Sequence, residues 1–145
     1  MTLPTMRGAA WQQVLMLPRR PAANLALTDI PTLPGVYVWF RDGEAVYVGE
    51  AKGTEGLRSR LGTHLRTSVD LSRSTLRASV AVQLLGVARS TARRRPSVMT
   101  PEQVAAVNQW LRACELAWVV CEDAAAAHQL EGALRTEWLP PLNRM

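Results

Sequence analysis

The chain has 145 residues, a length that predicts one domain with a single hydrophobic core. Hydrophobic residues make up 48% of the sequence and charged residues 20%, and no apolar run is long enough to span a bilayer. We find no leader pattern either, so we expect a cytoplasmic protein without membrane contact. The formal net charge is +5, and between Arg58 and Arg95 nine arginines stand against one acidic residue, Asp70. Such a concentrated basic segment indicates a polyanionic partner.

The first 32 residues contain four prolines around one short helical stretch, from Gly8 to Leu17. We interpret residues 1–32 as an N-terminal extension that packs on the core.

Two runs rich in β-branched and aromatic residues follow, at 36–40 and 45–48, and predict a hairpin. A two-residue loop, Asp42-Gly43, would put Tyr37 and Tyr47 on opposite faces of the hairpin. A loop of three residues, 41–43, would pair Tyr37 with Tyr47 and put both phenols on one face. We expect the three-residue loop, because Gly43 suits the left-handed position that ends it.

Leucines spaced four residues apart from Leu57 predict an amphipathic helix, with Arg60 and His64 together on its adjacent face. A second helix is expected at about 75–85, capped by Ser72 or Ser74. Residues 87–99 lack periodicity and are predicted to form a mobile loop. The remaining elements are a helix from Thr100 to about Ala113, a buried strand at 116–120, and a final helix from Asp123 through Trp138.

The hairpin carries two related triplets, Gly35-Val36-Tyr37 and Tyr47-Val48-Gly49, and Leu57-Arg58-Ser59-Arg60 follows them. This combination resembles the paired signature of the GIY-YIG nuclease family. The stretch Tyr47–Lys52 is also similar to the nuclease domain of bacterial nucleotide-excision-repair incision proteins, although Glu50 stands where those relatives tend to carry lysine. The resemblance implies an α+β fold over residues 33–145, with a small three-stranded antiparallel sheet flanked by helices. A basic helical insertion would lie at about 70–113.

The resemblance also implies a catalytic set, whose members here are Tyr37, Tyr47, Arg60, His64, Glu131 and Asn143. Glu131 would hold one divalent ion, Mg²⁺ or Mn²⁺, in a shell of oxygen ligands. Arg60 would clamp the scissile phosphate. Either Tyr37 or His64 would be the general base: a phenol needs help to ionise near neutral pH, whereas imidazole has an ordinary pKa near 6.5. Asn143 would position the last helix or bond a phosphate.

Basic side chains outside this set are expected to bind the nucleic-acid backbone. They are Lys52, Arg58, Arg73, Arg77, Arg93, Arg94 and Arg95.

The function we expect is endonucleolytic cleavage of DNA, in repair, restriction or the processing of branched DNA. A non-catalytic nucleic-acid-binding module on the same fold is the alternative, and no sequence feature excludes RNA as the substrate. The surface of so small a domain leaves little room for sequence readout, which is compatible with a dimer or a partner protein. Each catalytic candidate also has a plainer interpretation: Glu131 has the spacing to pair with Arg135, and the tyrosines could be ordinary strand aromatics.

Overall fold

The computed structural model describes residues 8–144, and at its centre lies an antiparallel sheet in the order β1-β4-β2-β3. Strands β2 (Gly35–Arg41), β3 (Glu44–Ala51) and β4 (Glu115–Val120) are the three predicted ones. A two-residue strand, β1 (Arg20–Pro21), pairs with β4 and adds a fourth. Strand β2 is central and almost wholly buried, as expected for a strand flanked on both edges and covered on both faces.

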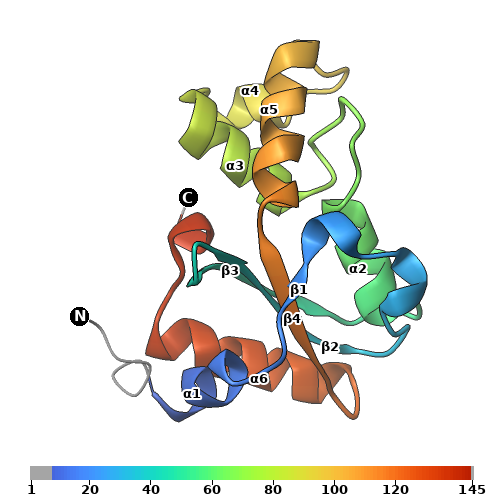
Figure 1. Ribbon diagram of the computed structural model, residues 1–145, viewed down its shortest axis with the longest axis vertical. Coiled ribbons are helices and arrows are strands. Elements are labelled where there is room, and N and C mark those ends of the chain that lie inside the picture. The colour runs from blue at the N-terminus through green and yellow to red at the C-terminus, as the bar shows by residue number, and fades with distance from the viewer. Residues whose placement is uncertain (1–7, 145) are drawn as a thin grey trace.

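The two faces of the sheet are covered by different helices (Figure 1). Helices α1 (Ala9–Leu15) and α6 (Ala124–Glu137) pack against one face, over Val36, Val38 and Phe40. On the other face, which carries both tyrosines, lie α2 (Gly56–His64) and the group α3 (Thr75–Leu85), α4 (Arg89–Ala92) and α5 (Pro101–Arg112). The remaining short elements are the 3-10 helices η2 (Ala22–Asn24), η3 (Leu27–Asp29) and η4 (Pro141–Arg144). None of the helices in residues 8–144 combines the length and apolar composition needed to cross a bilayer.

Helix α1 is tied to the end of α6 rather than to the sheet alone. The Glu137 carboxylate accepts hydrogen bonds from the backbone N–H groups of Ala10 and Trp11, both at 3.1 Å. The Trp11 indole N–H donates to the carbonyls of Leu134 and Trp138, at 2.7 and 3.0 Å. These bonds anchor α1 to the C-terminal end of α6, the helix that carries Glu131.

The hairpin differs from the prediction in its loop. The loop has two residues, not three, because Arg41 pairs with Glu44, and both loop residues have positive φ, 52° at Asp42 and 81° at Gly43. These values are typical of the tight turns that match the twist of paired strands. The register then shifts between Trp39 and Phe40, so that Trp39 pairs with Tyr47. This bulge turns Tyr47 to the face of Tyr37, and the predicted shared face is therefore correct for a different reason.

The expected mobile loop at 87–99 is also corrected. It contains helix α4, and Ala92 and Met99 are buried in the core beside α3 and α5. Sequence periodicity could not reveal a helix of four residues, because a single turn has no repeat to detect.

Candidate active site

The two tyrosines lie close together because strand β3 carries a glycine opposite the first of them. Tyr37 pairs with Gly49, and a Cβ at Gly49 would collide with the Tyr37 hydroxyl oxygen. The Tyr37 phenol thus lies against strand β3 at Gly49, and any side chain at that position would displace it. The ring centroids of Tyr37 and Tyr47 are 6.4 Å apart, and both residues are nearly closed off from solvent.

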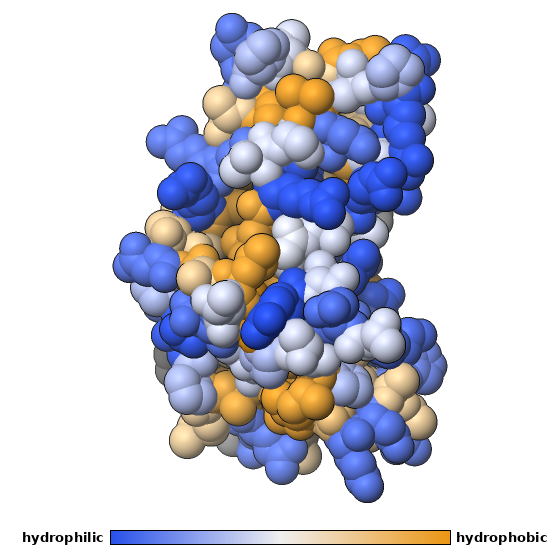
Figure 2. All heavy atoms as spheres, turned by 90° about the vertical axis from the view of Figure 1, so that its right-hand side faces the viewer, coloured by the Kyte–Doolittle hydropathy of each residue, from blue (hydrophilic) through white to orange (hydrophobic). Residues whose placement is uncertain are grey.

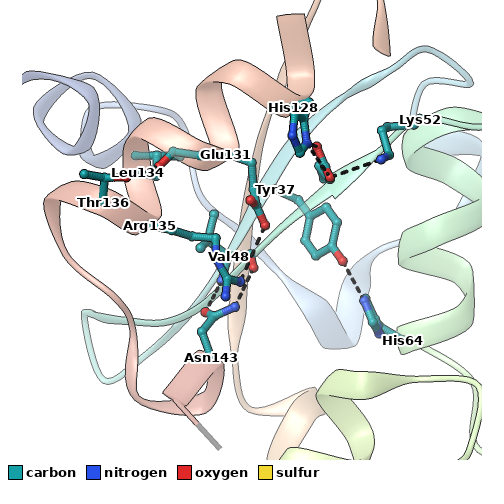
Figure 3. A network of polar contacts seen from close by, with 12 residues as sticks. Tyr37, Val48, Lys52, His64, His128, Glu131, Leu134, Arg135, Thr136 and Asn143 are labelled. Atoms are coloured by element: carbon teal, nitrogen blue, oxygen red, sulfur yellow. Dashed lines mark hydrogen bonds and ion pairs between the residues drawn. The ribbon is translucent and has the colours of Figure 1, made fainter. Parts of the chain in front are cut away.

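A buried chain of hydrogen bonds connects the first tyrosine to helix α3. The Tyr37 hydroxyl lies 2.7 Å from His64 Nε2, and His64 Nδ1 lies 2.6 Å from the Ser74 hydroxyl oxygen. Ser74 is also the N-cap of α3, where its oxygen accepts the backbone N–H of Arg77 at 3.0 Å. His64 is fully buried, so its place is behind Tyr37 (Figure 3) and not at the surface that meets a substrate.

The bonds of Ser74 decide the tautomer of His64. If the Ser74 hydroxyl accepted from both Arg77 and His64 Nδ1, its own proton would need a third partner in a buried environment. If instead that hydroxyl donates to Nδ1, Ser74 and both imidazole nitrogens are satisfied, and the Tyr37 oxygen is satisfied as well once it has lost its proton and accepts from Nε2. We therefore assign the proton of the imidazole to Nε2 in the state in which Tyr37 is ionised.

Burial favours the neutral form of both aromatic hydroxyls and of the imidazole. It raises the pKa of Tyr37, and Tyr47 adds to that rise, while the charge and hydrogen bond of Arg60 oppose it. Burial also raises the pKa of Tyr47, again against the charge of Arg60. Burial, together with the charges of Arg60 and Arg77, lowers the pKa of His64 to about 3. The Arg60 charge thus favours an ionised phenol and disfavours a protonated imidazole.

Glu131 lies on α6, near the tyrosines, in a group of charged side chains (Figure 3). Burial raises the pKa of its carboxyl, and the Glu50 carboxylate adds to the rise, while Arg135, His128 and Lys52 oppose it. Arg135 pairs with Glu131 at 3.7 Å, as the i,i+4 spacing predicted. The Glu131 side chain keeps 14% of its exposure.

Glu50 has its own partners on the same side of the sheet. Its carboxylate lies 3.1 Å from His128 Nδ1 and 3.4 Å from Lys52 Nζ. Lys52, expected to bind nucleic acid, is therefore already paired with an acid.

The carboxylates suit an oxygen-preferring ion better than a closed metal cage. Within residues 8–144, no three His, Cys, Asp or Glu side chains converge as a complete ligand set. Mg²⁺ does not require one, because it is commonly bound by one or two carboxylates together with water and phosphate oxygens. The mutual repulsion of Glu131 and Glu50, seen in the raised pKa of Glu131, would be relieved by a cation between or beside them. The residues present therefore fit a divalent ion at Glu131.

Asn143 bonds the backbone of an edge strand. Its Oδ1 accepts from the Val48 N–H at 2.8 Å, and its Nδ2 donates to the Val48 carbonyl at 2.9 Å. Strand β3 is the edge of the sheet, so the amide acts as a substitute for a neighbouring strand. These two bonds make Asn143 a residue that positions β3, and with it Tyr47 and Gly49, against the end of the chain.

One of the expected phosphate-binding residues is misassigned. Arg77 is 1% exposed, and its guanidinium donates to the carbonyls of Ser68 and Asp70 and to Asn108 Oδ1. It braces a loop from within and cannot reach a nucleic acid. The sequence shows Arg77 three residues after the helix cap, but burial depends on which elements pack around it.

The other expected phosphate-binding arginines lie nearer the surface. Arg58 is half-buried and donates to the Ile30 carbonyl at 2.8 Å. Arg73 and Arg95 are exposed and contact Asp70 and Ser72 respectively. Arg93 and Arg94 are exposed as well.

Three side chains of this site were not singled out for chemistry in the sequence. Ser74 was expected only as a helix cap, and its second bond, to His64, joins residues ten apart. His128 and Arg135 do carry a signal, because they lie three residues before and four after Glu131 on one helix. Their contacts with the acidic groups follow from that spacing.

The family comparison agrees with this geometry. A model of the GIY-YIG catalytic domain matches residues 35–145, which include both triplets and all six catalytic candidates. Neither the curated proteins nor the solved structures contain a match to the chain. Since the match spans more than half of the chain, this protein belongs to the GIY-YIG nuclease family.

Proposed function

We propose that this protein is a divalent-metal-dependent endonuclease that hydrolyses phosphodiester bonds of DNA. The observation that carries the proposal is the convergence of Tyr37, Tyr47, Arg60 and Glu131 from β2, β3, α2 and α6. Both Arg60 and Glu131 act electrostatically on both phenols. A surface that only bound nucleic acid would need positive charge, but it would need neither buried phenols nor a half-buried carboxylate.

Tyr37 is the general base in this proposal. An ionised Tyr37 would receive the Nε2 proton of His64 in a hydrogen bond, and the Arg60 cation would stabilise the negative charge. The opposite arrangement, with His64 as base, would create a buried imidazolium beside Arg60 and Arg77. The same charges therefore favour Tyr37 over His64.

The reaction then follows from the positions of these side chains. Tyr37 first loses its phenolic proton to solvent, and the resulting phenolate takes a proton from the attacking water, whose oxygen forms the new bond to phosphorus. The bond from phosphorus to the leaving oxygen breaks, and that oxygen is protonated from solvent. Arg60 holds the phosphoryl oxygens during this displacement, and Tyr47 orients the water or the phosphate beside Tyr37.

Glu131 would hold the ion, Mg²⁺ or Mn²⁺, once Arg135 is displaced from its carboxylate. When bound, such an ion neutralises charge on the phosphoryl oxygens and assists the leaving oxygen. The Lys52 cation opposes the charge of Glu50, and His128 bonds the same carboxylate, so that this second carboxylate repels the phosphate less.

Exposed arginines of the helical insertion would hold the DNA backbone. The exposed surface of the insertion carries Arg73, Arg93, Arg94 and Arg95. Arg58 lies at the start of α2. Contacts of this kind carry no sequence information. Selection of a site or a DNA shape would then fall to a dimer or to a partner protein.

The proposal is tested by cleavage of labelled duplex, single-stranded, forked and nicked DNA, with matching RNAs, in Mg²⁺, Mn²⁺ or EDTA. We expect metal-dependent cutting of DNA that is abolished in Glu131→Gln and Arg60→Ala. Glu102→Gln, which makes the same change of charge on the exposed start of α5, is expected to cut normally. Salt-sensitive binding without cutting under any metal would instead support the alternative function, a binding module. Cutting of RNA alone would show that the substrate is RNA and not DNA.

A further inference from the structure

A second hollow lies on the far side of His64 from Tyr37. This cleft has a volume of about 540 Å³, within the range of small-ligand sites. Its walls come from four places: the N-terminal segment from Ala22 to Leu27, the end of α2, the loop at 66–68, and α5. Figure 2 looks at this side of the molecule and shows apolar side chains at its waist, between strongly hydrophilic ones.

The cleft combines an aliphatic wall with positive charge. The apolar surface comes from Leu25, Leu27, Leu65 and Leu111. The lining includes no acidic residue. Two exposed arginines, Arg66 and Arg112, also line the cleft. A site of this composition suits a ligand with a flat or apolar part and an anionic group.

A third cation lies behind the lining. Arg77 Nη2 donates to the Ser68 carbonyl at 2.6 Å and to Asn108 Oδ1 at 3.0 Å, and both of these residues line the cleft. Arg77 is 1% exposed, its Nε has no hydrogen-bond partner, and the guanidinium bonds only to neutral acceptors within the described residues. Because none of these acceptors is charged and only the nearby Asp70 carboxylate opposes the Arg77 charge, Arg77 adds positive potential at the cleft, as its effect on His64 shows.

Polar groups in the lining narrow the class of ligand. Thr67 and Ser68 offer hydroxyl groups beside the aliphatic wall, whereas the Asn108 amide is already bonded to Arg77 and to the Thr67 carbonyl. Hydroxyl groups suit a ribose or the edge of a base better than an acyl chain. We propose that the cleft binds one nucleoside monophosphate unit, with its phosphate at Arg66 and Arg112 and its base on the leucine wall. The ligand class rests on the proposed function, because an endonuclease creates strand ends, and the terminal nucleotide of such an end carries the groups of a nucleoside monophosphate.

The proposed site is separate from the catalytic one but shares a side chain with it. His64 lines the cleft and also bonds the Tyr37 hydroxyl. Binding in the cleft needs neither a metal nor cleavage, so it can be measured in EDTA. Failure of this inference and failure of the nuclease proposal are therefore distinguishable.

The test is an amide NMR titration of the whole chain with dAMP in EDTA. We expect shifts concentrated at 62–68 and 108–112, and binding at least about tenfold weaker in Arg66→Ala and in Arg112→Ala. Arg144→Ala, which removes an exposed arginine outside the cleft, is expected to bind dAMP as the wild type does. Deoxyadenosine and inorganic phosphate, which each lack one half of the ligand, are expected to bind more weakly than dAMP.

Two further arms decide the source and the location of the ligand. A 5′-phosphorylated oligonucleotide that shifts the same amides with the same dependence on Arg66 would identify a strand end as the occupant. Dependence confined to free dAMP would identify the mononucleotide. Binding that is lost in Arg60→Ala but kept in Arg66→Ala would mean that the nucleotide sits in the catalytic site, and would overturn the inference. An absence of dAMP binding would overturn it as well.

Discussion

Ser74 offers the sharpest test of the proposed proton arrangement, because its hydroxyl has two separable roles. It caps helix α3 through the Arg77 N–H, and it sets the His64 tautomer through Nδ1. Ser74→Ala and Ser74→Gly both remove the bond to His64. They differ in the cap, because glycine is tolerated at an N-cap and alanine is not. Ser74→Thr keeps the hydroxyl.

The expected magnitudes follow from these bonds. Loss of the cap in Ser74→Ala costs roughly 1 kcal/mol of folding free energy, and an unpaired His64 Nδ1 costs a further 1–3 kcal/mol in both variants. Without the Ser74 donor, His64 can place its proton on Nδ1 and no longer donate to the Tyr37 oxygen. A hydrogen bond to a charged oxygen is worth about 1.5–3 kcal/mol, so kcat/KM should fall by about 10- to 150-fold.

The assay is a pH profile of DNA cleavage for the three variants beside a measurement of Tm. We expect equal losses of activity in Ser74→Ala and Ser74→Gly despite unequal stability, near-normal cleavage in Ser74→Thr, and a basic shift of the rising limb in the first two. If activity instead follows Tm across the series and the profile does not move, Ser74 is only a cap. The tautomer assignment would then be refuted.

Three other predictions concern charge. Because the folded pKa of His64 is lowered to about 3 from an ordinary 6.5, the unfolded chain binds the extra proton between these values. Stability should thus decrease as the pH is lowered through that window, by up to about 1.4 kcal/mol per pH unit. Urea titrations of wild type against His64→Gln would reveal this, with His128→Gln as the exposed control. Burial and Glu50 raise the pKa of Glu131, so the affinity for Mg²⁺, measured by calorimetry, should weaken as the pH falls and this carboxyl takes up a proton. Glu131→Gln should lack this pH dependence. Replacing all of 93–95 by alanine should weaken DNA binding and reduce its salt slope by about 0.9 per lost phosphate contact, and an unchanged slope would remove these arginines from the interface.

Local chemistry made several elements predictable. The Thr100 and Gln103 capping box begins α5 as expected, with both reciprocal bonds formed. Helix α3 runs from Thr75 to Leu85 and ends at Gly86, which has a φ of 70°. These features depend on residues within a few positions of each other, so they can be predicted from the sequence.

Features that depend on distant packing were not predictable in the same way. The hairpin required a choice between two loops, and the bulge near Trp39 and Tyr47 made a third solution that satisfies the tight turn and the shared face together. Arg77 looks like any other basic residue of its segment, yet it is enclosed between α3, α5 and the loop before it. A single sequence shows neither which bulge a sheet adopts nor which charge is enclosed.

The burial of Arg77 also changes how the helical insertion should be understood. A basic segment at 70–113 suggests an accessory arm that only holds DNA, and Arg93 and Arg94 have the exposure for that task. Ser74, however, comes from the same segment and bonds the imidazole behind Tyr37. The Arg77 charge, three residues on, disfavours protonation of that imidazole. In the proposed mechanism the insertion would therefore act on Tyr37 from behind as well as on the substrate from outside. Removing it would expose His64 and free its tautomer even if every catalytic candidate remained.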